Sequence, residues 1–116
     1  MNNQAAGAVG AGLTPRELAA LRENLEEQRR FRLDQLRGFS RAPGGTRTAA
    51  RTEVDTRLTA SARMVLADVE DALERMDRGR YGVCLRCDRP VPLHLLEIVP
   101  QARYCAPCRQ AREAGR

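Results

Sequence analysis

All four cysteines of the chain stand in two CxxC pairs near its C-terminal end. Cys84 and Cys87 form the first pair, and Cys105 and Cys108 form the second, with seventeen residues between the pairs. A two-residue gap lets each pair present two sulfur atoms to one ion, and the intervening loop lets the two pairs meet to complete a tetrahedron. The spacing therefore predicts one structural Zn²⁺ ion. Because protein sulfur would fill all four positions, no open position is left for a catalytic water, which argues against a zinc enzyme.

Two other uses of these residues have to be weighed. A CxxC pair can be a dithiol catalyst where it opens a helix in a βαβ unit, and the sequence has no βαβ pattern. A zinc-dependent or thiol-based redox sensor stays open as a less favoured alternative. His94 is the only histidine and lies between the pairs, where it could replace one ligand, but such a residue is more often a surface residue of a loop.

The composition indicates that a deep hydrophobic core does not hold this protein together. The chain has 116 residues with two Phe, two Tyr and no Trp, so it lacks the large side chains that usually fill a core. A thiolate-bound zinc in a module of zinc-finger size contributes roughly 10 to 16 kcal/mol of folding free energy, which would offset that lack. All 20 basic residues are arginine, and the net charge of +5 allows a nucleic-acid or acidic protein partner without deciding between them.

The N-terminal residues predict neither a signal peptide nor a membrane anchor. Residues 1–12 are rich in Ala and Gly and have neither a basic start nor a long apolar run, which is typical of a disordered leader. Nowhere does the sequence contain an apolar run approaching the roughly 18 residues that a membrane helix needs. We therefore expect a cytoplasmic protein that does not engage a membrane, and in a reducing compartment cysteines bind metal more often than they form disulfides.

The segment LTPREL has a residue pattern that is typical of the start of a helix. Thr14 can cap the helix, Pro15 suits its first position, and Glu17 stands where its side chain can bond back to the cap, which completes a capping box. Leu13 and Leu18 flank the box as a hydrophobic staple. The sequence thus predicts a helix from this point onward.

Two long amphipathic helices follow from the apolar periodicity. We expect the first to end at Gly38, and the second to begin at Thr52 as its cap and to stop at Gly79. Each would span about 24 to 27 residues, or on the order of 35 to 40 Å, and a short turn containing Pro and Gly separates them. The apolar positions pack the two helices together and need no other role. They are Leu18, Leu21, Leu25, Leu33, Leu36 and Phe39 in the first helix, and Val54, Leu58, Val65, Val69, Leu73 and Met76 in the second.

The predicted fold is mainly α. An antiparallel two-helix coiled-coil hairpin covers residues 13–80, with its tip at about 40–52, and a small four-cysteine zinc-finger module with a short C-terminal helix covers 81–116. The tip is basic, whereas the base of the second helix is acidic. An acidic run of this kind is usually a solvated helix face.

The segment RGRYGVCLRCDRPVPLHLLEIVPQARYCAPC resembles the zinc-finger signature of the DksA/TraR family. The matching residues are Tyr81, Gly82, Cys84, Cys87, Leu96, Glu97, Pro100, Ala102, Cys105 and Cys108. The resemblance implies a bacterial transcription regulator, not an enzyme, that binds RNA polymerase. It further implies that the hairpin enters the secondary channel of the polymerase while the zinc module stays at the rim.

The tip departs from the family pattern. Family members that act on the catalytic centre carry an acidic DxxDxA motif there, but residues 40–49 contain no Asp or Glu. We take Arg41, Arg47, Arg51 and Asp55 as candidate partner-binding residues of the tip. An arginine tip would attract catalytic carboxylates or nucleic-acid phosphates, whereas an acidic tip would repel them. Polymerase docking combined with a different regulatory output is therefore the leading hypothesis.

A nucleic-acid-binding zinc ribbon is the main alternative. Only two tyrosines lie near the cysteine pairs to stack on bases, so direct DNA or RNA binding stays open but is not favoured. The sequence does not predict target promoters, activation or repression, a response to ppGpp, or an oligomeric state. The arginines that would contact nucleic acid are Arg86, Arg89, Arg103, Arg109, Arg112 and Arg116.

Overall fold

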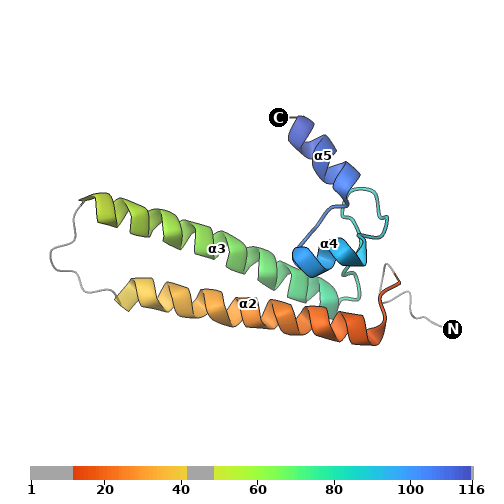
Figure 1. Cartoon of the computed structure of the whole chain (residues 1–116), viewed down its shortest axis with the longest axis horizontal. Coiled ribbons are helices and arrows are strands. Elements are labelled where there is room, and N and C mark those ends of the chain that lie inside the picture. The colour runs from red at the N-terminus through yellow and green to blue at the C-terminus, as the bar shows by residue number, and fades with distance from the viewer. Residues whose placement is uncertain (1–11, 42–48, 116) are drawn as a thin grey trace.

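The computed structural model of the chain describes residues 12–41 and 49–115, which form four helices. Helices α2 (Pro15–Arg41) and α3 (Ala49–Asp77) lie side by side and antiparallel as a rod, and the short helices α4 (Leu93–Ile98) and α5 (Ala106–Ala114) stand at one end of it (Figure 1). The described residues contain no strand, only one isolated β-bridge. These features confirm the predicted mainly α hairpin with a small cysteine module and a C-terminal helix.

The start of α2 has the predicted capping box. The backbone N–H of Glu17 donates to Thr14 Oγ1 at 3.0 Å, and the backbone N–H of Thr14 donates to Glu17 Oε1 at 2.9 Å. Two otherwise unpaired N–H groups are thereby satisfied at the exposed end of the helix. Leu13 is buried and Leu18 packs against the same cluster, as expected for a staple.

The inner ends of both helices differ from the prediction. Helix α2 does not end at Gly38 but continues to Arg41, and α3 begins three residues before Thr52, at Ala49. A glycine costs a helix only about 1 kcal/mol, and Gly38 is exposed with nothing to clash, so the helix continues through it. Residues 1–11 of the expected leader, and Arg47 with the rest of 42–48 in the expected tip, lie outside the described residues.

Helix α3 stops where the sequence indicated. Gly79 has a φ of +70°, and its N–H donates to the Met76 carbonyl at 3.0 Å while the N–H of Arg80 donates to the Arg75 carbonyl at 2.8 Å. This pair of bonds is a Schellman motif, which needs a left-handed residue that glycine adopts without strain. The chain leaves the hairpin here and enters the cysteine module.

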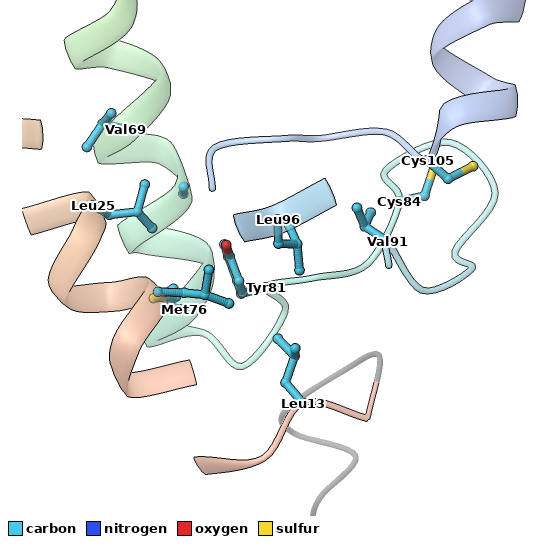
Figure 2. Packing of buried hydrophobic residues seen from close by; sticks show 11 residues of the cluster. Leu13, Leu25, Val69, Met76, Tyr81, Cys84, Val91, Leu96 and Cys105 are labelled. Carbon is cyan, nitrogen blue, oxygen red and sulfur yellow. The ribbon is translucent and has the colours of Figure 1, made fainter. Parts of the chain in front are cut away.

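The buried core lies at the base of the rod and joins the hairpin to the cysteine module. Leu25 of α2 and Val69 of α3 pack in one cluster with Tyr81, Val91 and Leu96 of the module (Figure 2). Among the described residues further out along the rod, Ala62 is the one buried apolar side chain. The packing that fixes the hairpin is therefore concentrated where the module sits.

Two ion pairs connect the helices across the rod. Arg22 Nη2 lies 2.8 Å from Asp77 Oδ1, and Arg29 Nε lies 3.0 Å from Glu70 Oε2. Both pairs are well exposed and contribute little to stability, but they mark the antiparallel alignment of the helices. Within the described ranges no helix is both long enough and apolar enough to cross a membrane.

Candidate metal centre

The two CxxC pairs meet at one point. One sulfur from each of the four cysteines lies within 4.8 Å of the other three, and Cys87 Sγ is 3.7 Å from Cys105 Sγ. A tetrahedral zinc with Zn–S bonds of about 2.3 Å requires sulfurs roughly 3.8 Å apart. Cys84 and Cys105 are buried, and Cys108 is half-buried. The donor set and the spacing both fit one structural zinc ion, and the four cysteines are the side chains that would hold it.

The first pair is positioned by a tight turn after Tyr81. The N–H of Cys84 donates to the Arg89 carbonyl at 2.8 Å, and the N–H of Asp88 donates back to the Cys84 carbonyl at 3.0 Å. Asp88 and Gly82 have φ values of +64° and +84°, which allow the chain to fold back this sharply. The turn directs both sulfurs of the pair to the same side.

The second pair is positioned by helix α5. Cys105 occupies the position just before the helix, Pro107 lies in its first turn, and Cys108 follows inside that turn. The N–H of Leu85 donates to the Arg103 carbonyl at 2.9 Å, which links the first turn to the segment leading into the second pair. Backbone bonds therefore hold the two halves of the site together.

Protons are distributed unevenly over the four sulfurs. Burial disfavours the Cys84 thiolate, but N–H groups of Cys105, Cys87 and Arg86 donate to its sulfur and lower its pKa to about 6. Hydrogen bonding to Cys105, followed by burial, raises the pKa of Cys108 to about 12. Four thiolates at this separation repel each other, so a cation is needed before all four release their protons.

A buried hydroxyl ties the module to the end of the hairpin. Tyr81 is 2% exposed, and its hydroxyl donates to the Pro100 carbonyl at 2.7 Å. Burial raises the pKa of Tyr81 to about 12, although the nearby Arg75 cation acts in the opposite direction. The loop between the two CxxC pairs is thus anchored to Tyr81, which lies in the same buried cluster as Leu96 (Figure 2).

Charged side chains make a second link between module and hairpin. Arg103 Nη2 lies 2.8 Å from Asp68 Oδ1, and Arg103 Nε lies 3.3 Å from Asp71 Oδ2. Arg75 is 8% exposed, and its Nε is 3.3 Å from the same Asp71 oxygen without hydrogen-bond alignment. Burial lowers the pKa of Arg75, although Asp71 partly restores it. The module therefore packs against the acidic base of α3.

This link was missed by reasoning from the sequence. Arg103 was taken as a candidate nucleic-acid contact, but its guanidinium is engaged by Asp68 and Asp71. Arg75 was not singled out at all. The pairs are 32 and 35 residues apart in sequence, so no local spacing signals them.

The remaining candidates lie away from the sulfurs. His94 is exposed on α4 and is not part of the cysteine cluster. Arg41 is the last residue of α2, and Arg51 is in the first turn of α3 with its Nε 3.8 Å from Asp55 Oδ1. Arg41, Arg51 and Asp55 thus lie at the end of the hairpin opposite the metal centre (Figure 1).

The fold and the site define a helical hairpin mounted on a four-cysteine zinc finger. Residues 79–114 match the family described as the prokaryotic dksA/traR C4-type zinc finger. The structure of transcription factor DksA2 from Pseudomonas aeruginosa is similar over 97% of this chain and 92% of that one, with a TM-score of 0.68 and 25% identity. The C-terminal module thus matches the dksA/traR C4-type zinc-finger family, and the chain as a whole shares the fold of DksA2.

Two further similarities were found. A structure from Chlamydia trachomatis L2 (LGV434), described as an RNA polymerase binding protein and transcriptional regulator, shares the fold with a TM-score of 0.53 and 20% identity, over 89% of this chain and 94% of that one. An uncharacterized protein from Aquifex aeolicus (strain VF5) is 40% identical over 52 residues. That match covers 43% of this chain and about a third, 36%, of the length of the relative.

Proposed function

We propose that this protein is a non-enzymatic regulator that binds RNA polymerase in the cytoplasm. The α2–α3 hairpin enters the secondary channel, and the zinc module stays at the rim. The observation that carries the proposal is the likeness to DksA2, a transcription factor, over nearly the whole length of both chains. A likeness of that extent includes the rod and its base together, and the rod is the part that can reach into a channel.

The dimensions of the molecule support the proposal. Its extents are 62 × 33 × 20 Å, so one axis is about twice the next. Two packed helices are narrow enough for a channel, whereas the module broadens one end of the molecule and would stop its entry. The buried core and the Arg103 contacts lie at that end and join the rod to the module.

The basic residues of the tip favour a regulatory effect that differs from that of family members with an acidic tip. Arg41 and Arg51 lie in the part of the hairpin where acidic family members have carboxylates. Asp55 lies half-buried beside Arg51. A guanidinium attracts carboxylates and phosphates near a catalytic centre instead of repelling them. We infer that docking is retained, while the effect on the catalytic centre has the opposite electrostatic sign.

A binding competition tests the proposal. Zinc-loaded protein should bind core RNA polymerase without DNA, at one copy per polymerase, and a known secondary-channel factor should displace it. A variant in which a short loop replaces residues 33–62 keeps the base and the zinc module and serves as the control, and it should bind more weakly by at least tenfold. Binding that the channel factor does not displace, or that the shortened variant retains in full, would refute insertion into the channel.

A further inference from the structure

Charge is separated along the rod. The described distal half, residues 29–41 and 49–67, carries eight arginines against three carboxylates. The base half, residues 13–28 and 68–78, carries four arginines against nine carboxylates. The Arg29–Glu70 ion pair lies at the boundary, so each half combines matching stretches of α2 and α3. The hairpin therefore has a strongly basic end and an acidic end.

Two of the distal arginines, Arg37 and Arg57, are held by weak surface ion pairs. Arg57 and Arg37 pair with carboxylates one helical turn away on their own helices, and all of these side chains are well exposed. Exposed pairs of this kind contribute at most about 1 kcal/mol, so a phosphate can replace the carboxylate at little cost. Arg30 and Arg63 have no ion pair within the described residues. The distal half can thus offer several guanidinium groups to an anionic partner.

An exposed aromatic ring lies among these arginines. Phe31 is 59% exposed on α2, and its neighbours in sequence are Arg30 and Arg32. The Arg32 guanidinium stands 5.2 Å from the centre of the Phe31 ring. More than half of the Phe31 surface is left in water by the described fold, and its burial by a partner would remove apolar surface from water. An exposed ring beside a guanidinium group, on a basic stretch of helix, is an arrangement on which a nucleic-acid base stacks while its phosphates are neutralised.

We propose that the distal half of the hairpin, centred on Arg30, Phe31, Arg57 and Arg63, binds single-stranded nucleic acid. Guanidinium forks match phosphate oxygens, and the exposed ring supplies the stacking surface that an acidic protein partner would not need. The acidic base half repels phosphates and confines the strand to the distal half. This site is distinct from the zinc-ribbon site, because its residues belong to the distal half of the hairpin and not to the cysteine module.

The proposal goes beyond polymerase binding and does not depend on it. The probes are fluorescent oligouridylate and oligothymidylate of about 20 nucleotides, longer than most single-strand sites. The full zinc-loaded chain should bind at least one of them in a fluorescence anisotropy titration, with an affinity that falls steeply as salt rises. Comparing the two probes separates RNA from DNA as the source of the strand.

Two matched pairs of variants locate the site. The distal triple variant Arg30→Gln, Arg57→Gln and Arg63→Gln should bind at least tenfold more weakly and reduce the salt slope by about 2. The finger triple variant Arg86→Gln, Arg89→Gln and Arg109→Gln removes equal charge and should change affinity less than twofold. Phe31→Ala should weaken binding about fivefold or more, whereas Met64→Ala, which truncates another exposed apolar residue, should not.

Several results would overturn the proposal. They are the absence of binding to both probes at low salt, an equal or larger loss in the finger triple variant, or an unchanged affinity in Phe31→Ala. Polyglutamate that competes as well as the oligonucleotides would indicate an acidic protein surface as the partner. Circular dichroism and zinc content, which the surface substitutions should leave unchanged, confirm that each variant is folded.

Discussion

The Tyr81 hydroxyl donates to the Pro100 carbonyl at 2.7 Å, across nineteen residues of sequence and inside the core. Tyr81 directly precedes the first CxxC turn, and Pro100 lies in the loop that leads to the second pair. Together with the backbone bond from Leu85 to Arg103, this bond connects the two pairs to each other and to the end of the hairpin. A metal site built from two separate turns is stabilised by contacts of this kind between its halves.

Removing that hydroxyl should weaken the folded state measurably. Tyr81→Phe keeps the ring but leaves the Pro100 carbonyl buried without a donor, which should lower the free energy of unfolding by about 1 to 3 kcal/mol. Urea denaturation of the zinc-loaded protein measures the change. Tyr104→Phe is the control, because the Tyr104 ring lies beneath Arg112 at 4.6 Å and keeps that contact without its hydroxyl. Equal losses in the two variants would contradict the assignment.

The same burial predicts a high-pH transition. The pKa of Tyr81 is raised to about 12 in the folded protein, whereas an unfolded tyrosine has a pKa near 10. The stability that this shift provides is present in full below about pH 10 and is lost as pH rises toward 12. Ultraviolet absorbance should show a phenolate step near pH 12 that Tyr81→Phe removes. A step near pH 10 that Tyr81→Phe removes would show that Tyr81 is not buried.

Gly38 and Gly79 should respond in opposite directions to substitution by alanine. Gly79→Ala places a side chain at a φ of +70°, which should cost about 1 to 2 kcal/mol. Gly38→Ala fills an exposed position inside α2 with open space around it and should stabilise the protein by up to about 1 kcal/mol. Thermal denaturation of the two variants measures both effects. Destabilisation by Gly38→Ala would indicate that α2 ends there after all.

Zinc removal should disrupt more than the cysteine module. Cys84 and Cys105 belong to the same buried cluster as Leu25 and Val69, so a strong chelator should lower both the helix signal and the melting temperature. Zinc affinity should fall as pH is lowered and should fall more steeply below about 6, because the ion must displace the Cys108 proton at neutral pH and the Cys84 proton as well below that value. Competition with a chromophoric chelator at several pH values measures this. A chelated protein with an unchanged melt would refute the structural role.

The local features of this fold could be predicted from the sequence. The cysteine spacing gave the metal centre, the Thr14–Glu17 capping box gave the start of α2, and Gly79 gave the end of α3, because each feature depends on residues close in sequence. The end of α2 was wrongly predicted at Gly38, since the small cost of one glycine does not outweigh the continued hydrogen bonding of a long helix.

The contacts between the hairpin and the module were beyond sequence reasoning. From the sequence Arg103 is expected to be a surface cation, but in the fold it lies beside Asp68 and Asp71 of α3. Arg75 is expected to be a solvated residue in an acidic run, but in the fold it is buried. Such contacts depend on how the two parts dock. Neither the residue types nor the apolar periodicity of one short segment predicts how the hairpin and the module dock.

Photo-crosslinking from two exposed side chains tests the placement of the hairpin most directly. Met64 and Ile98 are 69% and 76% exposed, on the rod and on the module respectively, so p-benzoylphenylalanine can replace either without disturbing the core. In the complex with core RNA polymerase, the probe at position 64 should crosslink to peptides that line the secondary channel, and the probe at position 98 to peptides at its rim. Crosslinks from position 64 only to the outer surface of the polymerase, or from neither position, would contradict the account.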